Sequence, residues 1–209
     1  MGRVYRFDGV VKRRHHIRQR TQQIMKTALI IIDIQNDYFP GGRMELVGAE
    51  QAALKAREAL AHFRSHNLAV VHIQHITTRP GATFFIPDTD GIPIHPSVAP
   101  LPGEAVFVKH FPNSFRDTPL LGHLKGLGIE RLVLAGMMTS MCVDATARAA
   151  SDLGFQNVLL HDAMATRDLA FNGVTVPAAQ VHGAFLAALG SVYGRVIGVA
   201  ELPAEQLKA

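Results

Sequence analysis

The chain has 209 residues, of which 48% are hydrophobic and 18% are charged, a balance typical of a soluble globular protein. No apolar run approaches the roughly 18 residues that a membrane span needs. The single cysteine excludes an intrachain disulfide and fits a reducing compartment. We therefore expect a cytoplasmic protein that has no membrane partner.

The positive charge lies mainly in residues 1–24, MGRVYRFDGVVKRRHHIRQRTQQI. This segment holds seven basic residues and one acidic residue, and the rest of the chain holds 14 basic and 16 acidic residues. The body is therefore nearly neutral, and a nucleic-acid partner is not expected. The segment lacks the apolar stretch of a secretory signal. We interpret it as an extension upstream of a natural start at Met25, with a disordered arm, a basic patch for an anionic partner, or a serine-free transit peptide as alternatives.

Residues 25–209 are then the expected folded domain, in which short apolar runs alternate with helical patterns. Strands are predicted over residues 27–32, 68–73, 105–108, 132–135, 157–160 and 196–199, and helices over 49–66, 119–127, 177–189 and after Gly136. Such runs suit strands covered on both faces, and the alternation implies a parallel sheet with right-handed crossovers. The predicted fold class is α/β, a three-layer αβα sandwich around a six-stranded parallel sheet of Rossmann-like order 3-2-1-4-5-6.

A long irregular stretch over residues 77–103 contains six prolines. Loops of this length inside a compact domain are usually functional. The chain has no Gly-rich phosphate loop, which disfavours nucleotide binding.

The only cysteine, Cys142, lies in RLVLAGMMTSMCVDATARAASDL, where a predicted strand is followed by a helix. The helix start offers unpaired N–H groups and the positive end of the helix dipole. A thiol at this place is expected to have a lowered pKa and to be a good nucleophile. The alternative is a small buried hydrophobic residue.

Two charged residues also follow predicted strands, Asp33 in ALIIIDIQNDYF and Lys109 in AVFVKHFPNSF. Ligands of open α/β sheets gather at the carboxyl ends of the strands, so Asp33, Lys109 and Cys142 are expected at one edge. Taken singly, Asp33 suits a turn and Lys109 a solvated surface. Taken together, the three favour a catalytic site.

With G-M-M-T-S-M-C-V around the cysteine, these motifs resemble the isochorismatase-like cysteine hydrolases, which include nicotinamidases, N-carbamoylsarcosine amidohydrolase and ureidoacrylate amidohydrolases. The resemblance covers residues 26–200 and implies a catalytic triad of Asp33, Lys109 and Cys142. It also implies an oxyanion hole formed by the backbone N–H groups of Met138 and Cys142, with a cis peptide bond between Met137 and Met138.

The charges suggest how this triad would work. An Asp beside a thiol can accept its proton as a general base and return it to a leaving amine. The cation of Lys109 would favour the thiolate and keep the pKa of Asp33 low. Attack on a carbonyl carbon would give an oxyanion that needs preorganised N–H donors, followed by a covalent acyl-thioester that water hydrolyses.

Four residues near these motifs are candidate substrate contacts, with core or loop packing as the alternative for each: Tyr38, Asn113, Phe115 and Thr139. Nicotinamidases bind a metal through an Asp-x-His after the second strand, where this chain has His75-Ile76-Thr77. We therefore expect no metal and no cofactor. Structural or exposed roles are favoured for four histidines, His72, His75, His95 and His110.

The function expected from this resemblance is a metal-independent cysteine hydrolase of a small amide, carbamoyl or ureido compound, acting as a homo-oligomer. One alternative is a catalytically silent family member that serves as a binding or scaffold subunit. The other is a nicotinamidase-like, metal-containing amidase.

Overall fold

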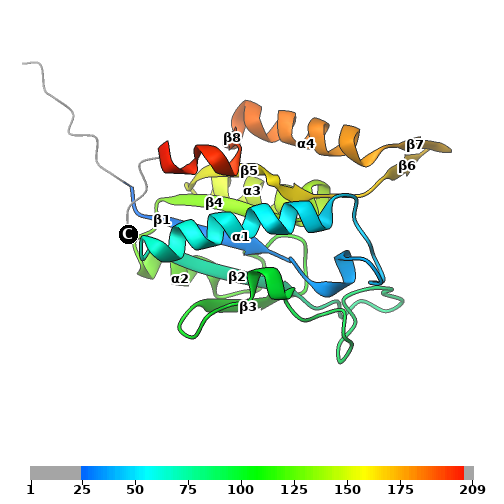
Figure 1. The fold of residues 1–209 in the computed structure, drawn as a ribbon, viewed down its shortest axis with the longest axis horizontal. Helices are drawn as coiled ribbons and strands as arrows, with labels where there is room; N and C mark the ends of the chain where they lie inside the picture. The colour runs from blue at the N-terminus through cyan, green and yellow to red at the C-terminus, as the bar shows by residue number, and fades with distance from the viewer. Residues whose placement is uncertain (1–24, 205–209) are drawn as a thin grey trace, which may run out of the picture.

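The computed structural model describes residues 25–204, so the predicted extension over residues 1–24 lies outside the described residues. A six-stranded sheet runs through the molecule with helices on both faces (Figure 1). Its strands are β1 (Thr27–Ile32), β2 (Ala69–His75), β3 (Ala105–Lys109), β4 (Arg131–Met137), β5 (Gln156–Ala165) and β8 (Arg195–Ile197).

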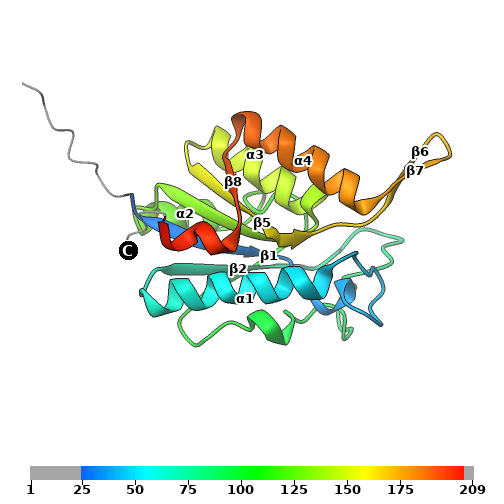
Figure 2. The same cartoon turned by 45° about the horizontal axis from the view of Figure 1, so that its top comes forward.

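The strand order is β3-β2-β1-β4-β5-β8, and every neighbouring pair is parallel. This confirms the predicted three-layer α/β fold and its order, with β8 as the sixth strand of the sheet. Two further strands, β6 (Leu169–Phe171) and β7 (Val174–Val176), form a separate antiparallel hairpin. The hairpin extends away from the sheet beside the amino-terminal end of α4 (Figure 2).

Four α-helices connect the strands: α1 (Ala49–Ser65), α2 (Leu120–Gly126), α3 (Asp144–Asp152) and α4 (Ala178–Val192). Helix α1 lies on one side of the sheet, and α3 and α4 lie on the other (Figure 2). Short 3-10 turns, η1 (Asn36–Tyr38), η2 (Pro96–Val98) and η4 (Val199–Ala204), fill the loops.

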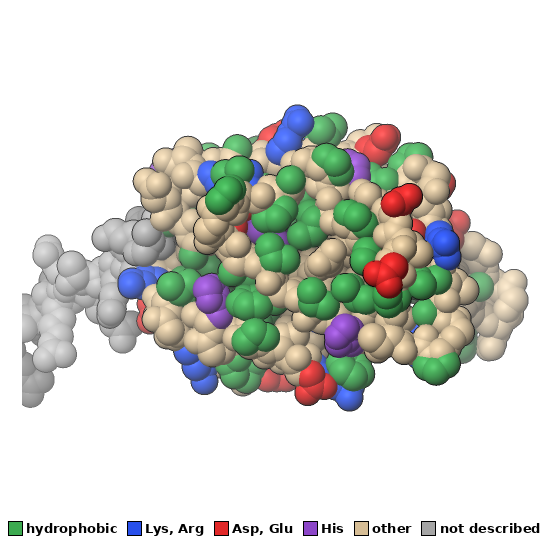
Figure 3. All heavy atoms as spheres, turned by 90° about the horizontal axis from the view of Figure 1, so that it is seen from below, with side chains coloured by type: hydrophobic (Ala, Val, Ile, Leu, Met, Phe, Trp, Pro, Cys, Tyr) green, Lys and Arg blue, Asp and Glu red, His purple; other side chains and the backbone are tan. Residues whose placement is uncertain are grey.

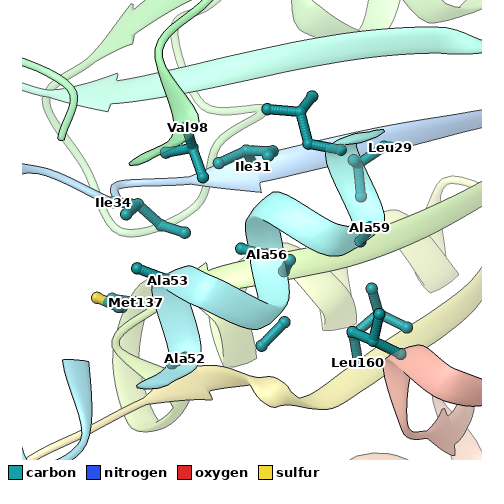
Figure 4. Close-up of a cluster of buried hydrophobic side chains, with 14 of the residues drawn as sticks. Leu29, Ile31, Ile34, Ala52, Ala53, Ala56, Ala59, Val98, Met137 and Leu160 are labelled. Carbon is teal, nitrogen blue, oxygen red and sulfur yellow. The ribbon is translucent and has the colours of Figure 1, made fainter. Parts of the chain in front are cut away.

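Strand β1 is buried along its whole length because its alternating side chains enter two different cores. Leu29 and Ile31 face α1, whereas Ile30 and Ile32 pack with α2, α3 and α4. The face of α1 toward the sheet is rich in alanine, including Ala53 (Figure 4). Small side chains let a helix lie close to the strands, so the central strand is held from both sides.

The predicted strand boundaries fall short at the carboxyl ends of β2, β4 and β5. The hairpin β6–β7 was missed entirely, although Asn172-Gly173 is a strong turn signal for a two-residue hairpin. Both residues have positive φ, 49° and 76°, as that turn requires. Strands of three residues carry too little periodicity to be recognised.

None of the helices within residues 25–204 is long and apolar enough to cross a membrane. Figure 3 shows one face of the described part of the molecule, where hydrophobic and uncharged side chains predominate. Lys and Arg side chains lie mostly around the rim of this view.

Candidate active site

Four chemically active side chains meet at the carboxyl edge of the sheet. Asp33 directly follows β1, His75 ends β2, Lys109 ends β3, and Cys142 lies in the turn after β4. The parallel register places His75 opposite Lys109. Because β3, β2, β1 and β4 are successive neighbours, residues separated by more than 100 positions reach one site.

A glycine lets the central strands approach closely beside this site. Gly136 in β4 pairs with Ile32 of β1, and a side chain there would collide with the Ile32 carbonyl oxygen. The next residue along β1, Asp33, has a φ of 51°, in the left-handed region that Asp tolerates better than most residues. This turn of the backbone directs the chain out of the sheet after β1.

The cysteine lies in a wide helical turn rather than in a regular helix start. Thr139–Val143 forms a π-helical turn ahead of α3, with the Val143 N–H donating to the Met138 carbonyl at 3.2 Å. The Met137–Met138 peptide bond is cis, as the sequence resemblance implied. The Thr139 hydroxyl donates to the Ala165 carbonyl at 3.2 Å, which ties this turn to β5.

Asp33 and Lys109 form a buried ion pair, with Lys109 Nζ 2.8 Å from Asp33 Oδ2. Burial opposes ionisation of Asp33, but Lys109 and His75 outweigh it and hold the pKa of this carboxyl below its usual range. Burial likewise opposes the charge of Lys109, yet the negative charge of Asp33 keeps the pKa of Lys109 raised. Lys109 also donates to the Pro112 carbonyl at 2.8 Å, and Asp33 Oδ1 has no hydrogen-bond partner among the described residues.

The Cys142 thiol does not have the lowered pKa that its sequence position suggested. Burial raises its pKa, the negative charge of Asp33 raises it further, and the positive charge of Lys109 opposes the shift. The thiol is 4% exposed, so desolvation of a thiolate outweighs the helix dipole. Forming the nucleophile here requires a proton acceptor nearby.

His75 is a site residue to which sequence reasoning assigned only a structural or exposed role. Its Nδ1 lies 3.8 Å from Asp33 Oδ2 and 3.9 Å from Cys142 Sγ. The buried Gln35 side chain accepts from the His75 N–H at 2.7 Å and donates to the His75 carbonyl at 2.9 Å. The signal available in the sequence was position alone, because His75 ends a strand adjacent to those of Asp33 and Lys109.

The other three histidines considered above, His72, His95 and His110, make different contacts. His72 is buried against Glu104, and His95 stacks on Phe39 with ring centroids 3.7 Å apart. His110 interacts through Nδ1 with the Ile76 carbonyl at 2.7 Å. Structural or surface contacts therefore account for His72 and His95, while the ring of His110 borders the cavity described next.

A cavity of about 440 Å³ opens onto the thiol. Its walls combine aromatic and sulfur-containing side chains with a few polar groups, and they comprise Tyr38, His75, Thr77, Thr78, Arg79, Phe84, His110, Phe111, Pro112, Met138, Met141 and Cys142. Neither Asp33 nor Lys109 belongs to this wall, because both are sealed beneath it with 0% and 1% exposure. The site is therefore an apolar pocket with a charged floor.

Of the four predicted substrate contacts, the structure brings only Tyr38 to the cavity. Asn113 accepts a hydrogen bond from the Phe115 N–H at 2.9 Å, and the Phe115 ring stacks on Phe155. Thr139 interacts with His182 Nδ1 at 2.9 Å. Packing, the alternative allowed for each, describes the positions of Asn113, Phe115 and Thr139.

One group of potential metal donors occurs within residues 25–204. Asp33, His75 and Cys142 each offer one donor atom, and these atoms lie within 4.8 Å of one another. The ammonium of Lys109 already occupies the approach to Asp33 Oδ2 at 2.8 Å, and a cation there repels a dication. This donor set therefore fits proton transfer better than metal coordination.

Comparison with known proteins gives concordant matches. The isochorismatase domain model matches residues 27–187. The isochorismatase family protein YddQ of Bacillus subtilis is 51% identical over 172 residues, covering 82% of this chain and 96% of that protein. A streptothricin hydrolase of Streptomyces noursei is 37% identical, covering 84% and 70%. The crystal structure of an isochorismatase hydrolase from Oleispira antarctica has a TM-score of 0.83 and 52% identity, covering 88% and 98%. The chain belongs to the isochorismatase family of hydrolases.

Proposed function

We propose that this protein is a cysteine-dependent hydrolase of a small amide, carbamoyl or ureido compound, acting through a covalent acyl-thioester. The observation that carries the proposal is a buried thiol at the floor of an apolar cavity, backed by the Asp33–Lys109 ion pair. The similarity to a streptothricin hydrolase supports hydrolysis as the reaction class.

In this proposal Cys142 is the nucleophile and Asp33 is the base that receives its proton. Asp33 Oδ1, which has no hydrogen-bond partner among the described residues, has a lone pair free for that proton. This transfer moves the negative charge from Asp33 to Sγ and leaves the total charge of the site unchanged. The positive charge of Lys109 counters the negative charge at either place. The cation thereby lowers the cost of forming a thiolate in a buried place.

Attack of Sγ on the carbonyl carbon converts its oxygen into an oxyanion. We assign its stabilisation to the backbone N–H groups of Met138 and Cys142, the two ends of the turn that carries the nucleophile. Preorganised backbone donors of this kind contribute about 3 kcal/mol each to transition-state stabilisation. The C–N bond then breaks, the leaving nitrogen takes a proton, and water hydrolyses the thioester.

The cavity limits the substrate to a small molecule with a flat, apolar portion. Its volume of about 440 Å³ lies within the range of small-ligand sites and well below what a peptide or polymer occupies. Tyr38 and Phe84 lie together in its wall, with ring centroids 6.0 Å apart, and Phe111 is a third aromatic side chain of the lining. Such walls suit a planar acyl or ureido group.

The raised pKa of Cys142 is the one observation that favours a silent binding subunit over an enzyme. Two measurements separate these functions. The wild-type protein and Cys142→Ala are assayed for ammonia release from a panel of small primary amides, carbamoyl amino acids and ureido acids. Release by the wild type and its loss in the variant are expected, because the variant keeps a small residue at the same place. Residual turnover within tenfold of the wild type would refute the assignment of Cys142.

Alkylation gives an independent test that needs no substrate. Iodoacetamide should modify Cys142 of the wild type near neutral pH, since the positive charge of Lys109 beneath the thiol favours the thiolate. A thiol that stays unmodified while the protein is folded would support the silent subunit.

We also propose that the protein assembles as a homo-oligomer through the projecting hairpin. Phe171 and Val174 in this hairpin are 75% and 65% exposed, and exposed apolar side chains that cluster often mark interfaces. Light scattering of the wild type and of Phe171→Ser would test this, with a smaller particle expected for the variant. A monomeric wild type would contradict it.

A further inference from the structure

The reaction leaves one proton without a path to the cavity. Asp33 receives the thiol proton in the proposed function, but its carboxylate is 0% exposed and does not line the cavity. The leaving nitrogen is in the cavity. Lys109 does not deliver the proton either, because it is buried, outside the cavity wall and holds its charge against Asp33.

His75 bridges the floor and the cavity. Five titratable side chains border the cavity in the described part of the chain, namely Tyr38, His75, Arg79, His110 and Cys142. Tyr38 lies within electrostatic range of Asp33, but apart from the nucleophile only His75 among these has an ion-pair contact with Asp33, with Nδ1 3.8 Å from Oδ2. The same Nδ1 is 3.9 Å from Cys142 Sγ. The contact with Asp33 is longer than a hydrogen bond and the contact with sulfur is a long one, as is common in a catalytic site without substrate.

The imidazole is also held in place by its surroundings. Gln35 pairs with both backbone groups of His75, much as a neighbouring strand would. Gln35 is buried and donates in addition to the Ile92 carbonyl at 2.7 Å. The ring of Phe85, fully buried, lies against the imidazole with centroids 5.7 Å apart. Gln35 thus fixes the backbone of His75 and Phe85 packs on its ring, which positions the imidazole beside the nucleophile.

We propose that His75 is a fourth catalytic residue, which carries the proton between Asp33 and the cavity. This rests on the proposed function. In acylation, the thiol proton moves to Asp33 as Sγ bonds to the carbonyl carbon. It then passes to His75 Nδ1, and the imidazolium gives its Nε2 proton to the leaving nitrogen as the C–N bond breaks. Ammonia or an amine departs, and Asp33 is again a carboxylate.

Deacylation uses the same path in reverse. A water molecule in the cavity gives a proton to His75 Nε2 while its oxygen bonds to the thioester carbon. The C–S bond breaks, the electron pair returns to sulfur, and the Nδ1 proton passes to Asp33 and from there to sulfur, which restores the thiol. The sum of both steps is amide plus water giving acid plus amine, with no net change in the enzyme. An imidazole suits such a step because one ring nitrogen can accept a proton while the other donates one.

The test uses p-nitrophenyl acetate, because its leaving group departs as an anion and needs no proton. The full-length wild type should release a burst of one p-nitrophenolate per chain, followed by a slower steady state set by deacylation. In His75→Gln, the burst should keep its amplitude and stay within about threefold in rate, while the steady-state rate falls about 100-fold, as expected for loss of an acid–base group. His75→Ala should regain steady-state turnover when imidazole is added.

His95→Gln is the control, because His95 is a histidine outside the cavity wall that stacks on Phe39. Its ratio of burst rate to steady-state rate should equal that of the wild type. Equal losses of burst and steady state in folded His75→Gln would show a merely structural role and overturn the proposal. Unchanged deacylation in the same variant would overturn it as well. A wild type without a burst on Cys142 would instead refute the proposed function itself.

Discussion

Two acid–base clusters lie beside strands β2 and β3, a buried one at their carboxyl ends and a half-buried one toward their amino ends. At the carboxyl edge, Asp33 faces Lys109 and His75. Near the other end, Glu104 faces Arg64 and His72, with His72 Nε2 2.9 Å from its carboxylate. Each cluster contains one carboxylate, one strong cation and one histidine, so residue types alone do not tell them apart.

The difference lies in how fully each carboxylate is hydrogen-bonded. Glu104 accepts from Arg64 Nε at 2.7 Å, from Arg64 Nη2 at 2.8 Å and from the Leu101 N–H at 2.9 Å. Asp33 has its ion pair and an oxygen without a hydrogen-bond partner in the described chain. Saturated networks rigidify a fold, whereas an unsatisfied buried group calls for an explanation in function. The comparison favours a structural role for Glu104 and supports the proposed proton transfer at Asp33.

The largest expected effect comes from Asp33→Asn. Turnover should fall about 1,000-fold or more, because an amide cannot accept the thiol proton. Alkylation should not fall in parallel: the charge of Asp33 raises the pKa of Cys142, so its removal lowers that pKa and increases the thiolate fraction. Hydrolysis and iodoacetamide labelling of one preparation measure both. Asn tolerates the positive φ at this position, which makes it the least disruptive replacement.

A parallel loss of alkylation and turnover in Asp33→Asn would contradict this prediction. It would mean that Asp33 holds the site together instead of exchanging a proton. The melting temperature shows which case applies, because an unpaired buried Lys109 destabilises the fold by about 3–5 kcal/mol.

A smaller effect is expected for Lys109→Met, which keeps most of the side-chain volume. The positive charge of Lys109 lowers the pKa of Cys142, so its removal raises that pKa and moves the alkylation rate profile to higher pH. Near pH 7 alkylation should slow about tenfold or more, since one pKa unit is a tenfold change in thiolate. A profile at the wild-type position would show that Lys109 has no electrostatic role.

At the other cluster, Glu104→Gln should affect stability and leave hydrolysis unchanged. Burial opposes the charge of Glu104, but Arg64 outweighs it and holds the pKa at about 2, below the ordinary 4.5. Its stabilising effect is therefore full above about pH 4.5 and is lost as the pH falls toward 2. We expect a loss of about 1–3 kcal/mol near pH 7. In thermal melts, the stability difference between the wild type and Glu104→Gln should be smaller at pH 3 than at pH 7. Glu130→Gln, at an exposed position, is the control.

The sequence was most informative about residues that carry a reactive side chain and also follow a strand of the predicted sheet. Asp33, Lys109 and Cys142 each follow a strand of the predicted sheet, and parallel topology brings strand ends together. The same logic applies to His75, but the predicted strand stopped at residue 73, whereas β2 continues to His75. A strand boundary two residues too short thus concealed a site residue.

Packing explains what the sequence could not show. The lowered thiol pKa was inferred from the helix start, whereas burial, which depends on the whole fold, raises it. Asn113 and Phe115 follow Lys109 closely in sequence, yet the chain turns after Pro112 and places the Phe115 ring against Phe155. Nearness along the chain does not fix the direction of a side chain once a loop intervenes.

The smallest effect is expected from removal of metal ions. Dialysis against EDTA should leave hydrolysis unchanged, because the thiolate attacks the carbonyl without a metal-bound water. Asp33, His75 and Cys142 have the spacing of donors, but the Lys109 ammonium repels a dication by about 8 kcal/mol at 4 Å and an effective dielectric constant of 20. Lys109→Met removes this repulsion and keeps the three donors, so it should bind Zn²⁺ more tightly than the wild type in a calorimetric titration. Activity lost on dialysis and restored by one divalent ion would contradict the prediction and favour the metal-containing amidase.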